Sequence, residues 1–264
     1  MRIPRSHPRY RSLVTRETIV AAHRKGIVVL EGLIAHGRGE AFDYLLGEET
    51  SAPALVAERA AAAFLLTAKR PVISVNGNVA ALAAKPVARL AAAIPARVEV
   101  NLFHRTEERV RRIVRLLERA GAEDVLGLRP NARIPGLSSD RARCHREGIY
   151  SSDVVVVPLE DGDRTEALAR MGKAVIAIDL NPMSRTTVAA TVPVVDEVTR
   201  ALPQIERFAR VMAADPTEAG RIVGGYDRAG NLAATYAFLR WRLSKLVHVT
   251  KGARGPKRSP TRKR

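Results

Sequence analysis

The stretch DVVVVPLEDGDRTEALARMGKAVIAIDLNPMSRT, residues 153–186, carries the pattern that decides the fold. Its two apolar runs, at residues 154–159 and 174–178, contain almost no polar residue, as is typical of strands buried on both faces of a parallel sheet. The residues between them, 164–171, have the spacing of a helix. The stretch therefore predicts two parallel strands joined by a crossover helix.

The same alternation of strand and helix continues on both sides of this unit. Four further β-branched runs predict strands, at residues 72–75, 97–103, 125–128 and 192–195. Helices are predicted at residues 79–93, bent or broken near Pro86, between Thr106 and Gly121, and at residues 197–213. The sequence thus predicts an α/β fold with an open, mostly parallel, doubly wound sheet.

Four parts of the chain are expected around this sheet. Residues 1–70 form a helical region with helices at 15–25 and 53–69, and residues 71–213 form the core. Residues 214–250 form an extension, in which a glycine-rich hinge leads to a helix at 232–247. Residues 251–264 have neither periodicity nor apolar residues to bury, so we expect a disordered basic tail.

One segment of the N-terminal region stands out by its polar content. LIAHGRGEAFDYLLGE, residues 33–48, places one histidine, one arginine and several acids among glycines and aliphatic residues. We interpret it as a loop or short helix that folds over the strand ends. Its glycines would let the backbone approach a ligand closely.

The composition predicts a soluble, cytoplasmic protein with no membrane partner. The 264 residues are 46% hydrophobic, which suits one large globular domain or one domain with a small appendage. No apolar run reaches the roughly 20 residues of a membrane-spanning helix, and the N-terminus has no apolar signal segment. The single cysteine, Cys144, excludes an intrachain disulfide and a cysteine-based zinc cluster, and we interpret it as structural.

The positive charge is concentrated at the C-terminus. The formal net charge is +17, and the segment 240–264 supplies ten positive charges without a single acid. Such a tail is compatible with nucleic-acid binding or with a role in solubility alone, and we slightly favour solubility. The moderate excess on the rest of the chain equally suits an anionic small-molecule substrate.

Polar side chains follow the predicted strands at the points where they end. In chain order these are Asn76 and Asn78; Asn101, His104 and Arg105; Asp161, Asp163 and Arg164; Asp179, Asn181, Arg185 and Thr186; and Asp196 and Glu197. The carboxyl ends of parallel strands share one edge of a sheet, so these residues are expected to ring a single crevice. Arginines near helix N-termini there indicate phosphate or carboxylate recognition.

Several common nucleotide and catalytic motifs are absent. There is no GxxxxGK[ST] loop, no complete GxGxxG, no HExxH, no nucleophile elbow and no spacing typical of a metal site. The residues alone therefore indicate an α/β enzyme with a phosphorylated or nucleotide ligand. A nicotinamide-dependent oxidoreductase is an alternative, disfavoured by the missing GxGxxG.

Seven blocks of the sequence carry a resemblance that goes further. They are IPRSHPRY (3–10), GLIAHGRGEAFDYLLGE (32–48), PVISVNGNVAAL (71–82), EVNLFHRTEERV (99–110), ARIPGL (132–137), DVVVVPLEDGDRTEALARMGK (153–173) and VIAIDLNPMSRT (175–186). Together they resemble the archaeal 4-phosphopantoate–β-alanine ligase family, also called phosphopantothenate synthetase. The resemblance extends from about residue 3 to residue 212 and leaves the basic tail outside it.

The resemblance implies a homodimer with a Rossmann-like nucleotide region. It implies an enzyme of coenzyme A biosynthesis that makes 4′-phosphopantothenate from ATP, (R)-4-phosphopantoate and β-alanine, and releases AMP and diphosphate. The route it implies is adenylation of the phosphopantoate carboxylate, followed by attack of the β-alanine amine. Mg²⁺ would be carried with ATP, and no separate metal site is expected.

The resemblance also implies roles for individual residues. The ATP contacts it implies are Arg16, Arg38, Asp179, Leu180, Asn181, Arg185, Thr186, Asp196 and Glu197. The family usually has Asp-Asn where this chain has Asp196-Glu197. The remaining strand-end residues, Asn76, Asn78, Asn101, His104, Arg105, Asp161, Asp163 and Arg164, are candidates for substrate binding, with Arg105 and His104 at the 4-phosphate. For catalysis we expect Arg38 to meet phosphate, and His36, Glu40 or Asp43 to serve as base.

Overall fold

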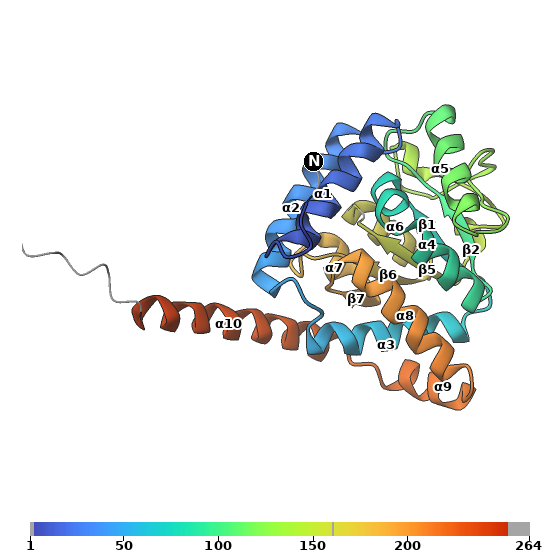
Figure 1. The fold of residues 1–264 in the computed structure, drawn as a ribbon. Coiled ribbons are helices and arrows are strands. Elements are labelled where there is room, and N and C mark those ends of the chain that lie inside the picture. The colour runs from blue at the N-terminus through green and yellow to red at the C-terminus, as the bar shows by residue number, and fades with distance from the viewer. Residues whose placement is uncertain (1–2, 160, 253–264) are drawn as a thin grey trace, which may run out of the picture.

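Parallel strands form the centre of the molecule, and helices pack on both faces of the sheet (Figure 1). The computed structural model describes residues 3–159 and 161–252, and within them the sheet has five strands. They are β1 (Pro71–Val75), β2 (Arg97–Val100), β5 (Val154–Pro158), β6 (Ala174–Ile178) and β7 (Val192–Val194). Every neighbouring pair is parallel, in the order β2-β1-β5-β6-β7. The predicted α/β fold is confirmed, and this sheet is wholly parallel.

The sheet is doubly wound, which means that helices cover both of its faces. Its strands therefore bury side chains on both faces. Val155 and Val157 of β5 lie in the core under helix α6 (Gly162–Arg170). Val154 and Val156 lie in the larger core on the other face, under α4 (Gly77–Ala93) and α8 (Val198–Met212). The chain leaves β1 toward β2 but leaves β5 in the opposite direction toward β6 and β7. The strand order thus reverses between β1 and β5, where open α/β sheets bind ligands.

Side chains at the strand ends begin several of these helices. Asn76 accepts a hydrogen bond from the Val79 N–H of α4 at 3.0 Å, and Thr106 accepts one from Arg109 at the start of α5 (Glu107–Arg119). The predicted bend in α4 is confirmed at Ala83 (φ −136°, ψ 25°), three residues before Pro86. Proline lacks an N–H and crowds the preceding turn, so the regular hydrogen bonding of the helix cannot continue there.

The predicted strand at residues 125–128 is wrong. Only Leu126 pairs with the sheet, as an isolated bridge to Glu99 of β2. The flanking residues Asp124 (φ 44°) and Gly127 (φ 139°) both have positive φ, which interrupts an extended chain. β2 and β5 also end earlier than predicted, and Leu159 (φ 52°) turns the chain away directly after β5.

The N-terminal region consists of the helices α1 (Tyr10–Arg24), α2 (Leu30–Leu46) and α3 (Ala52–Thr67). The loop or short helix predicted at residues 33–48 is therefore wrong, because most of that segment lies in the 17-residue helix α2. Phe42 and Leu46 lie four residues apart and pack with Leu180. This packing outweighs the low helix propensity of the internal glycines. The helix ends at Gly47, whose φ of 98° is a left-handed cap.

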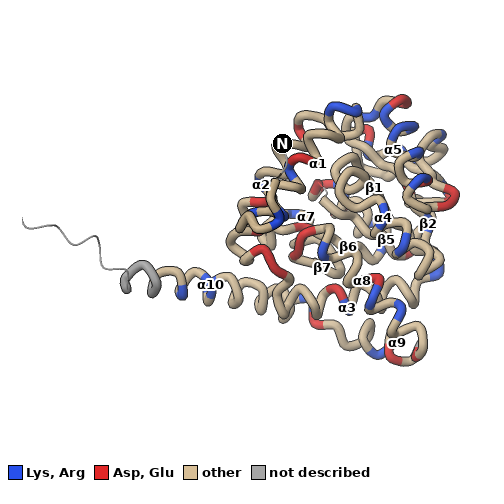
Figure 2. Tube along the Cα trace, in the orientation of Figure 1, with Lys and Arg blue, Asp and Glu red and all other residues tan. Residues whose placement is uncertain are grey.

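The C-terminal extension contains two helices. Where a hinge was predicted, α9 (Pro216–Gly225) is a helix, because Asp215 caps it by accepting a hydrogen bond from the Thr217 N–H at 3.0 Å. The last helix, α10 (Arg228–Gly252), packs on α3 and α2 with its first part and then leaves the body of the molecule (Figure 1). It carries basic and no acidic residues (Figure 2). The predicted tail lies outside the described residues from 253 onward, and the boundaries at residues 70, 213 and 250 stay predictions.

The remaining elements are short. They are the antiparallel strands β3 (Ala132–Arg133) and β4 (Arg143–Cys144), the 3₁₀ turns η1 (Asp140–Ala142) and η2 (Ile149–Ser151), and the helix α7 (Arg185–Ala189). Cys144 is buried in the core under α6, as a structural cysteine would be. In the described part of the chain, no helix has the length and apolar character needed to cross a membrane.

Candidate active site

A cleft of about 910 Å³ lies between the N-terminal helices α1 and α2 and the carboxyl ends of the strands. It brings together 13 of the 19 predicted site residues: His36, Arg38, Glu40, Asn76, Asn78, His104, Asp161, Asp179, Leu180, Asn181, Arg185, Thr186 and Glu197. Asp43 also lines it. The prediction of one crevice at the strand ends is therefore confirmed. Six predicted residues lie outside its lining: Arg16, Asn101, Arg105, Asp163, Arg164 and Asp196.

The loop from β6 to α7 forms a tight polar turn on one side of the cleft. The Asp179 carboxylate accepts hydrogen bonds from the Asn181 N–H at 3.0 Å and from the Ser184 hydroxyl at 2.5 Å. Asn181 in turn accepts one from the Met183 N–H at 3.0 Å. Burial raises the pKa of Asp179, while these hydrogen bonds and the charge of Arg38 oppose the rise. The loop thus presents a fixed carboxylate to the cleft.

Arg185 and Thr186 begin α7 beside this loop. The Arg185 guanidinium pairs with Glu166 of α6 through two hydrogen bonds of 3.1 and 2.9 Å and is exposed. Thr186 is 2% exposed. Gly162 permits the close approach of α6 and α7, because a Cβ there would lie 2.3 Å from the Cβ of Arg185. Arg185 therefore sits at the rim, and its position depends on α6.

Asp196, predicted to contact ATP, is buried behind the cleft rather than in its lining. It is 1% exposed and accepts hydrogen bonds from Thr50 at 2.6 Å and from the Arg200 Nε at 2.8 Å. Arg200 also donates to Asp43 at 2.5 Å and lines the cleft. Arg200 was missed from the sequence, although it follows Asp196 by one helical turn. Two carboxylates thus hold one cleft-facing guanidinium.

Two further acidic residues, Glu197 and Glu58, lie near Asp196 and Arg200. Glu197 caps α8 by accepting a hydrogen bond from the Thr199 N–H at 2.7 Å, and burial raises its pKa. Glu58 of α3 is 0% exposed, and burial together with the charge of Asp196 raises its pKa to about 9. Glu58 is therefore neutral at pH 7, which removes the cost of burying another negative charge.

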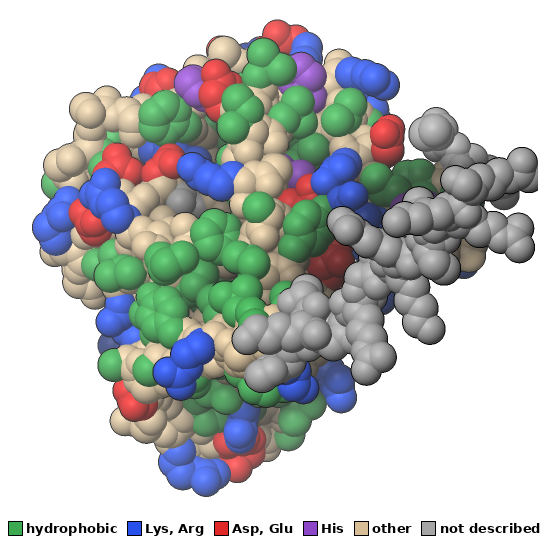
Figure 3. All heavy atoms as spheres, turned by 90° about the vertical axis from the view of Figure 1, so that its left-hand side faces the viewer, with side chains coloured by type: hydrophobic (Ala, Val, Ile, Leu, Met, Phe, Trp, Pro, Cys, Tyr) green, Lys and Arg blue, Asp and Glu red, His purple; other side chains and the backbone are tan. Residues whose placement is uncertain are grey.

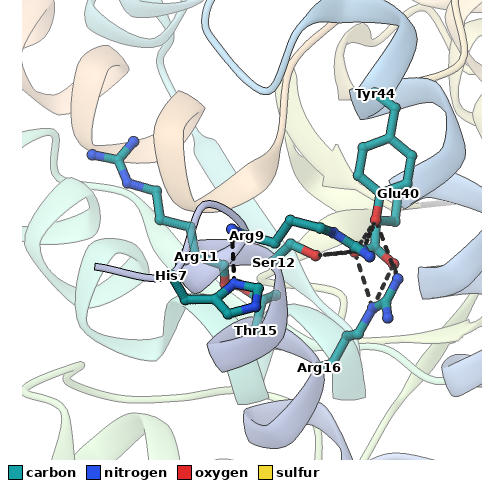
Figure 4. A network of polar contacts seen from close by, with 8 residues as sticks. All are labelled: His7, Arg9, Arg11, Ser12, Thr15, Arg16, Glu40 and Tyr44. Carbon is teal, nitrogen blue, oxygen red and sulfur yellow. Dashed lines mark hydrogen bonds and ion pairs between the residues drawn. The ribbon is translucent and has the colours of Figure 1, made fainter. Parts of the chain in front are cut away.

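Glu40 joins α2 to α1 (Figure 4). Its carboxylate accepts hydrogen bonds from the Arg16 Nε at 3.0 and 2.8 Å, from the Tyr44 hydroxyl at 2.8 Å and from the Ser12 hydroxyl. Burial opposes ionisation, but these hydrogen bonds outweigh it and lower the pKa of Glu40. Arg16 and Glu40, predicted as an ATP ligand and a base, are thus engaged with each other. We call these four residues the Glu40 cluster.

His36 and Arg38 extend from α2 into the cleft without joining the Glu40 cluster. Burial lowers the pKa of His36, so its imidazole is neutral at pH 7 and can accept a proton. Arg38 is exposed, and its side chain makes no hydrogen bond or ion pair with any residue in the described part of the chain. Its charge reaches Asp179 on the opposite wall. These two predicted residues are free to meet a ligand.

The junction between β1 and β5 is fixed by Asn76. Its side-chain amide donates to the carbonyls of Pro158 at 3.0 Å and of Leu159 at 2.9 Å. Leu159 has a φ of 52°, an uncommon value for a residue other than glycine, and strained backbone of this kind is often found at functional sites. Asn78 similarly donates to the carbonyl of Gly32 at 2.8 Å and ties α4 to α2. Both asparagines line the cleft as predicted, with these bonds to the backbone.

Four residues near β2 and α6 that were predicted to bind substrate lie outside the cleft lining and make hydrogen bonds within the protein. Arg105 donates to the carbonyls of Gly127 and Leu128, and Asn101 donates to those of Arg141 and Arg143. Asp163 accepts from the Arg164 N–H, and Arg164 is 0% exposed with a hydrogen bond to Ser74 at 3.0 Å. A strand-end position alone does not show whether a side chain faces the cleft or the protein interior.

Two cleft arginines near β2 were missed. Arg109 lies in the first turn of α5 and donates to the carbonyls of Ile27 at 2.9 Å and His104 at 2.6 Å. Arg141 of η1 is 7% exposed and pairs with Asp161 at 3.1 Å. Arg109 is one of several arginines in its helix, and Arg141 lies in an irregular segment. The sequence carries no local signal that separates either from surface arginines.

The described residues contain no group of three or more histidine, cysteine or acidic side chains that could hold a metal ion.

The sequence matches a protein family and several named relatives over most of its length. Residues 53–242 match the family model described as phosphopantothenate/pantothenate synthetase. The chain is 64% identical over 206 residues to the 4-phosphopantoate–β-alanine ligase of Methanospirillum hungatei, covering 78% of this chain and 84% of the relative. It is 52% identical to the enzyme of that name from Thermococcus kodakarensis, covering 93% of this chain and 95% of the relative, and 50% identical to the one from Methanosarcina mazei, covering 94% and 98%. The chain therefore belongs to the phosphopantothenate/pantothenate synthetase family.

Proposed function

We propose that this protein is an ATP-dependent ligase of coenzyme A biosynthesis that joins (R)-4-phosphopantoate to β-alanine. Its products would be 4′-phosphopantothenate, AMP and diphosphate. The observation that carries the proposal is the identity of 50–64%, over most of the chain, to relatives that bear the name of this ligase. The cleft at the reversal of strand order supports it, because that is where such sheets bind nucleotides and their reaction partners.

The proposed nucleotide half of the cleft lies at β6 and β7. There Asp179, Leu180 and Asn181 would contact the nucleoside, with the Asp179 carboxylate accepting from ribose hydroxyls. Arg38 and Arg185 would contact the phosphates from opposite walls. Mg²⁺ would enter with ATP as part of the substrate. Asp196 would act through Arg200, which it holds at 2.8 Å, rather than by touching ATP.

The proposed reaction has two displacements. A carboxylate oxygen of 4-phosphopantoate attacks the α-phosphorus of ATP, and diphosphate leaves with the electron pair of the broken P–O bond. The β-alanine nitrogen then attacks the acyl carbon, and AMP leaves with the former carboxylate oxygen. Arg38 would stabilise charge on the phosphates during the first step. The amine of β-alanine must lose a proton before it attacks, and neutral His36 would accept it.

A product assay tests this function. Purified protein is incubated with MgATP, 4-phosphopantoate and β-alanine, and the nucleotides and acids are separated by liquid chromatography and mass spectrometry. We expect AMP and 4′-phosphopantothenate in equal amounts, and neither when one of the acids is omitted. ADP as the nucleotide product, or equal turnover of unphosphorylated pantoate, would overturn the proposal.

We also propose that two copies associate through an apolar surface beside the nucleotide half. It comprises Met183, Val188, Tyr236, Leu243, Leu246 and Val247, which are 39–63% exposed. Figure 3 shows hydrophobic side chains gathered on this side of the molecule. The Tyr236 hydroxyl donates to the Pro182 carbonyl at 2.9 Å, which joins α10 to the loop after β6. Exposed apolar patches of this kind mark interfaces, and the C-terminal part of α10 projects from the body of the molecule in Figure 1, where a second copy can cover it.

A further inference from the structure

The order of the strands divides the cleft into two halves. The proposed nucleotide contacts lie at the carboxyl ends of β6 and β7. The carboxyl ends of β1 and β2 lie along the same edge, on the other side of β5. β5 alone separates β1 from β6, so the two ends lie about 10 Å apart at the usual spacing of neighbouring strands. The acid substrate must extend from the β1 and β2 half to the α-phosphate of ATP. Its own phosphate would then lie at the far end, near β2.

Arg109 occupies that end of the cleft. Its Nε donates to the Ile27 carbonyl at 2.9 Å and its Nη1 to the His104 carbonyl at 2.6 Å, which fixes the guanidinium plane. The guanidinium lies against the start of α4, because a Cβ on Gly77 would come within 2.6 Å of Arg109 Nη2. The first-turn N–H groups of this 17-residue helix therefore lie beside a fixed cation.

Arg141 of η1 lines the same cleft, and its Nη1 lies 3.5 Å from the carbonyl oxygen of Asn101, the residue after β2. It is 7% exposed and pairs with Asp161 at 3.1 Å. Burial, and then the charge of Arg141, lowers the pKa of Arg109, while the charge of the exposed Glu31 opposes this effect. Among the described residues, Glu31 lies near Arg109 and Asp161 pairs with Arg141. The half-buried Arg109 and the buried Arg141 thus line the same cleft, where a dianionic phosphate would stabilise both guanidiniums.

We propose that Arg109 and Arg141 bind the phosphate of 4-phosphopantoate and so set the preference for the phosphorylated over the unphosphorylated acid. The proposal rests on the ligase function proposed above. It replaces Arg105, which holds the carbonyls of Gly127 and Leu128, as the expected phosphate ligand. His104 remains at the edge of the same site, with its Nε2 3.9 Å from Glu31.

The direct test is the kinetics of Arg109→Gln. A hydrogen bond to a charged group contributes about 1.5–3 kcal/mol, so the KM for 4-phosphopantoate is expected to rise roughly 10- to 150-fold. The KM for ATP should stay within about twofold of wild type, because ATP does not contact this site. An unchanged KM for 4-phosphopantoate in an active, folded Arg109→Gln enzyme would overturn the inference. Wild-type protein without ligase activity would instead overturn the proposed function.

Arg112→Gln is the matched control. Arg112 lies on the same helix, donates to the neighbouring Lys25 carbonyl at 3.1 Å and pairs with Glu108, but it does not line the cleft. Its loss should leave all the Michaelis constants unchanged. A rise in the KM for 4-phosphopantoate as large as that in Arg109→Gln would assign the effect to the packing of α5.

Inhibition by inorganic phosphate tests the site in the wild-type enzyme. This measurement does not depend on whether a variant folds. Phosphate alone should bind between Arg109 and Arg141 and compete with 4-phosphopantoate, but not with ATP. Competition with ATP only would contradict the assignment. In a folded Arg141→Gln enzyme, the same inhibition should weaken by about the factor that raises the KM for 4-phosphopantoate.

Discussion

Among single residues, Arg38 is the side chain whose loss should separate function from stability. Because it has no hydrogen-bonding partner in the described part of the chain, Arg38→Ala should leave the melting temperature unchanged. It should lower kcat/KM for ATP roughly 10- to 100-fold, the effect of one charge-assisted hydrogen bond. Steady-state kinetics and thermal denaturation measure the two effects, with the exposed Arg207→Ala on α8 as control. Wild-type kinetics of Arg38→Ala would show that this part of α2 does not contribute to the ATP site.

Glu58 predicts a specific dependence of stability on pH. Its pKa is about 9 in the folded protein against 4.5 for the ordinary side chain, so the folded state holds one more proton between these values. The free energy of unfolding should therefore fall by about 1.4 kcal/mol per pH unit relative to Glu58→Gln, which cannot ionise. The difference should be constant below pH 4.5 and above about pH 9.

Urea unfolding of both proteins at several pH values measures this difference. Glu123→Gln, at an exposed position, is the control and should follow the wild-type profile. Parallel profiles for wild type and Glu58→Gln would show that Glu58 is ionised in the folded protein.

Some residues that line the cleft could be predicted from the sequence and others could not, for a physical reason. Asp179 and Asn181 could be predicted because polar residues directly after a buried strand lie at the ligand edge of the sheet. Asp196 follows a strand in the same way, yet its carboxylate turns inward to Arg200. The difference depends on partners distant in sequence, such as Thr50, which no local pattern contains.

At the scale of elements, α2 differs most from expectation. Its glycines and polar residues indicate a loop, but Phe42 and Leu46 pack on Leu180, far away in the sequence. α9 was missed for a related reason, since its helix is capped by Asp215 and packs on α3 despite its glycines. In both cases tertiary packing outweighs local propensity. The strands of the sheet were easier to predict, because burial on both faces leaves a continuous apolar run.

The Glu40 cluster should hold α1 on α2, and Glu40→Gln tests this role. The variant keeps the shape but loses the charge that Arg16 contacts at 2.8 Å, so we expect a loss of about 1 kcal/mol in the free energy of unfolding. Amide hydrogen exchange should increase in α1 while the strands stay protected. A melting temperature equal to that of wild type, with turnover abolished, would instead assign Glu40 to catalysis as a base.

At the scale of the whole molecule, the apolar surface on α10 and α7 predicts the oligomeric state. Light scattering should give twice the chain mass of 28.7 kDa for the wild type and the single-chain mass for the double variant Leu243→Glu, Leu246→Glu. Charges in an apolar interface cost far more than they do in water. Val211→Glu, on the 65% exposed side chain of α8, is the control and should remain dimeric. An unchanged mass for the double variant would place any interface elsewhere.

The central claim is that one cleft brings a carboxylate to ATP and then an amine to the activated acid. 4-Phosphopantoate labelled with ¹⁸O in both carboxylate oxygens, incubated with the protein, MgATP and β-alanine, tests it most directly. Mass spectrometry should find one labelled oxygen in AMP and the other in the amide carbonyl of 4′-phosphopantothenate. Unlabelled AMP, or label in inorganic phosphate together with ADP, would contradict attack of the carboxylate on the α-phosphorus.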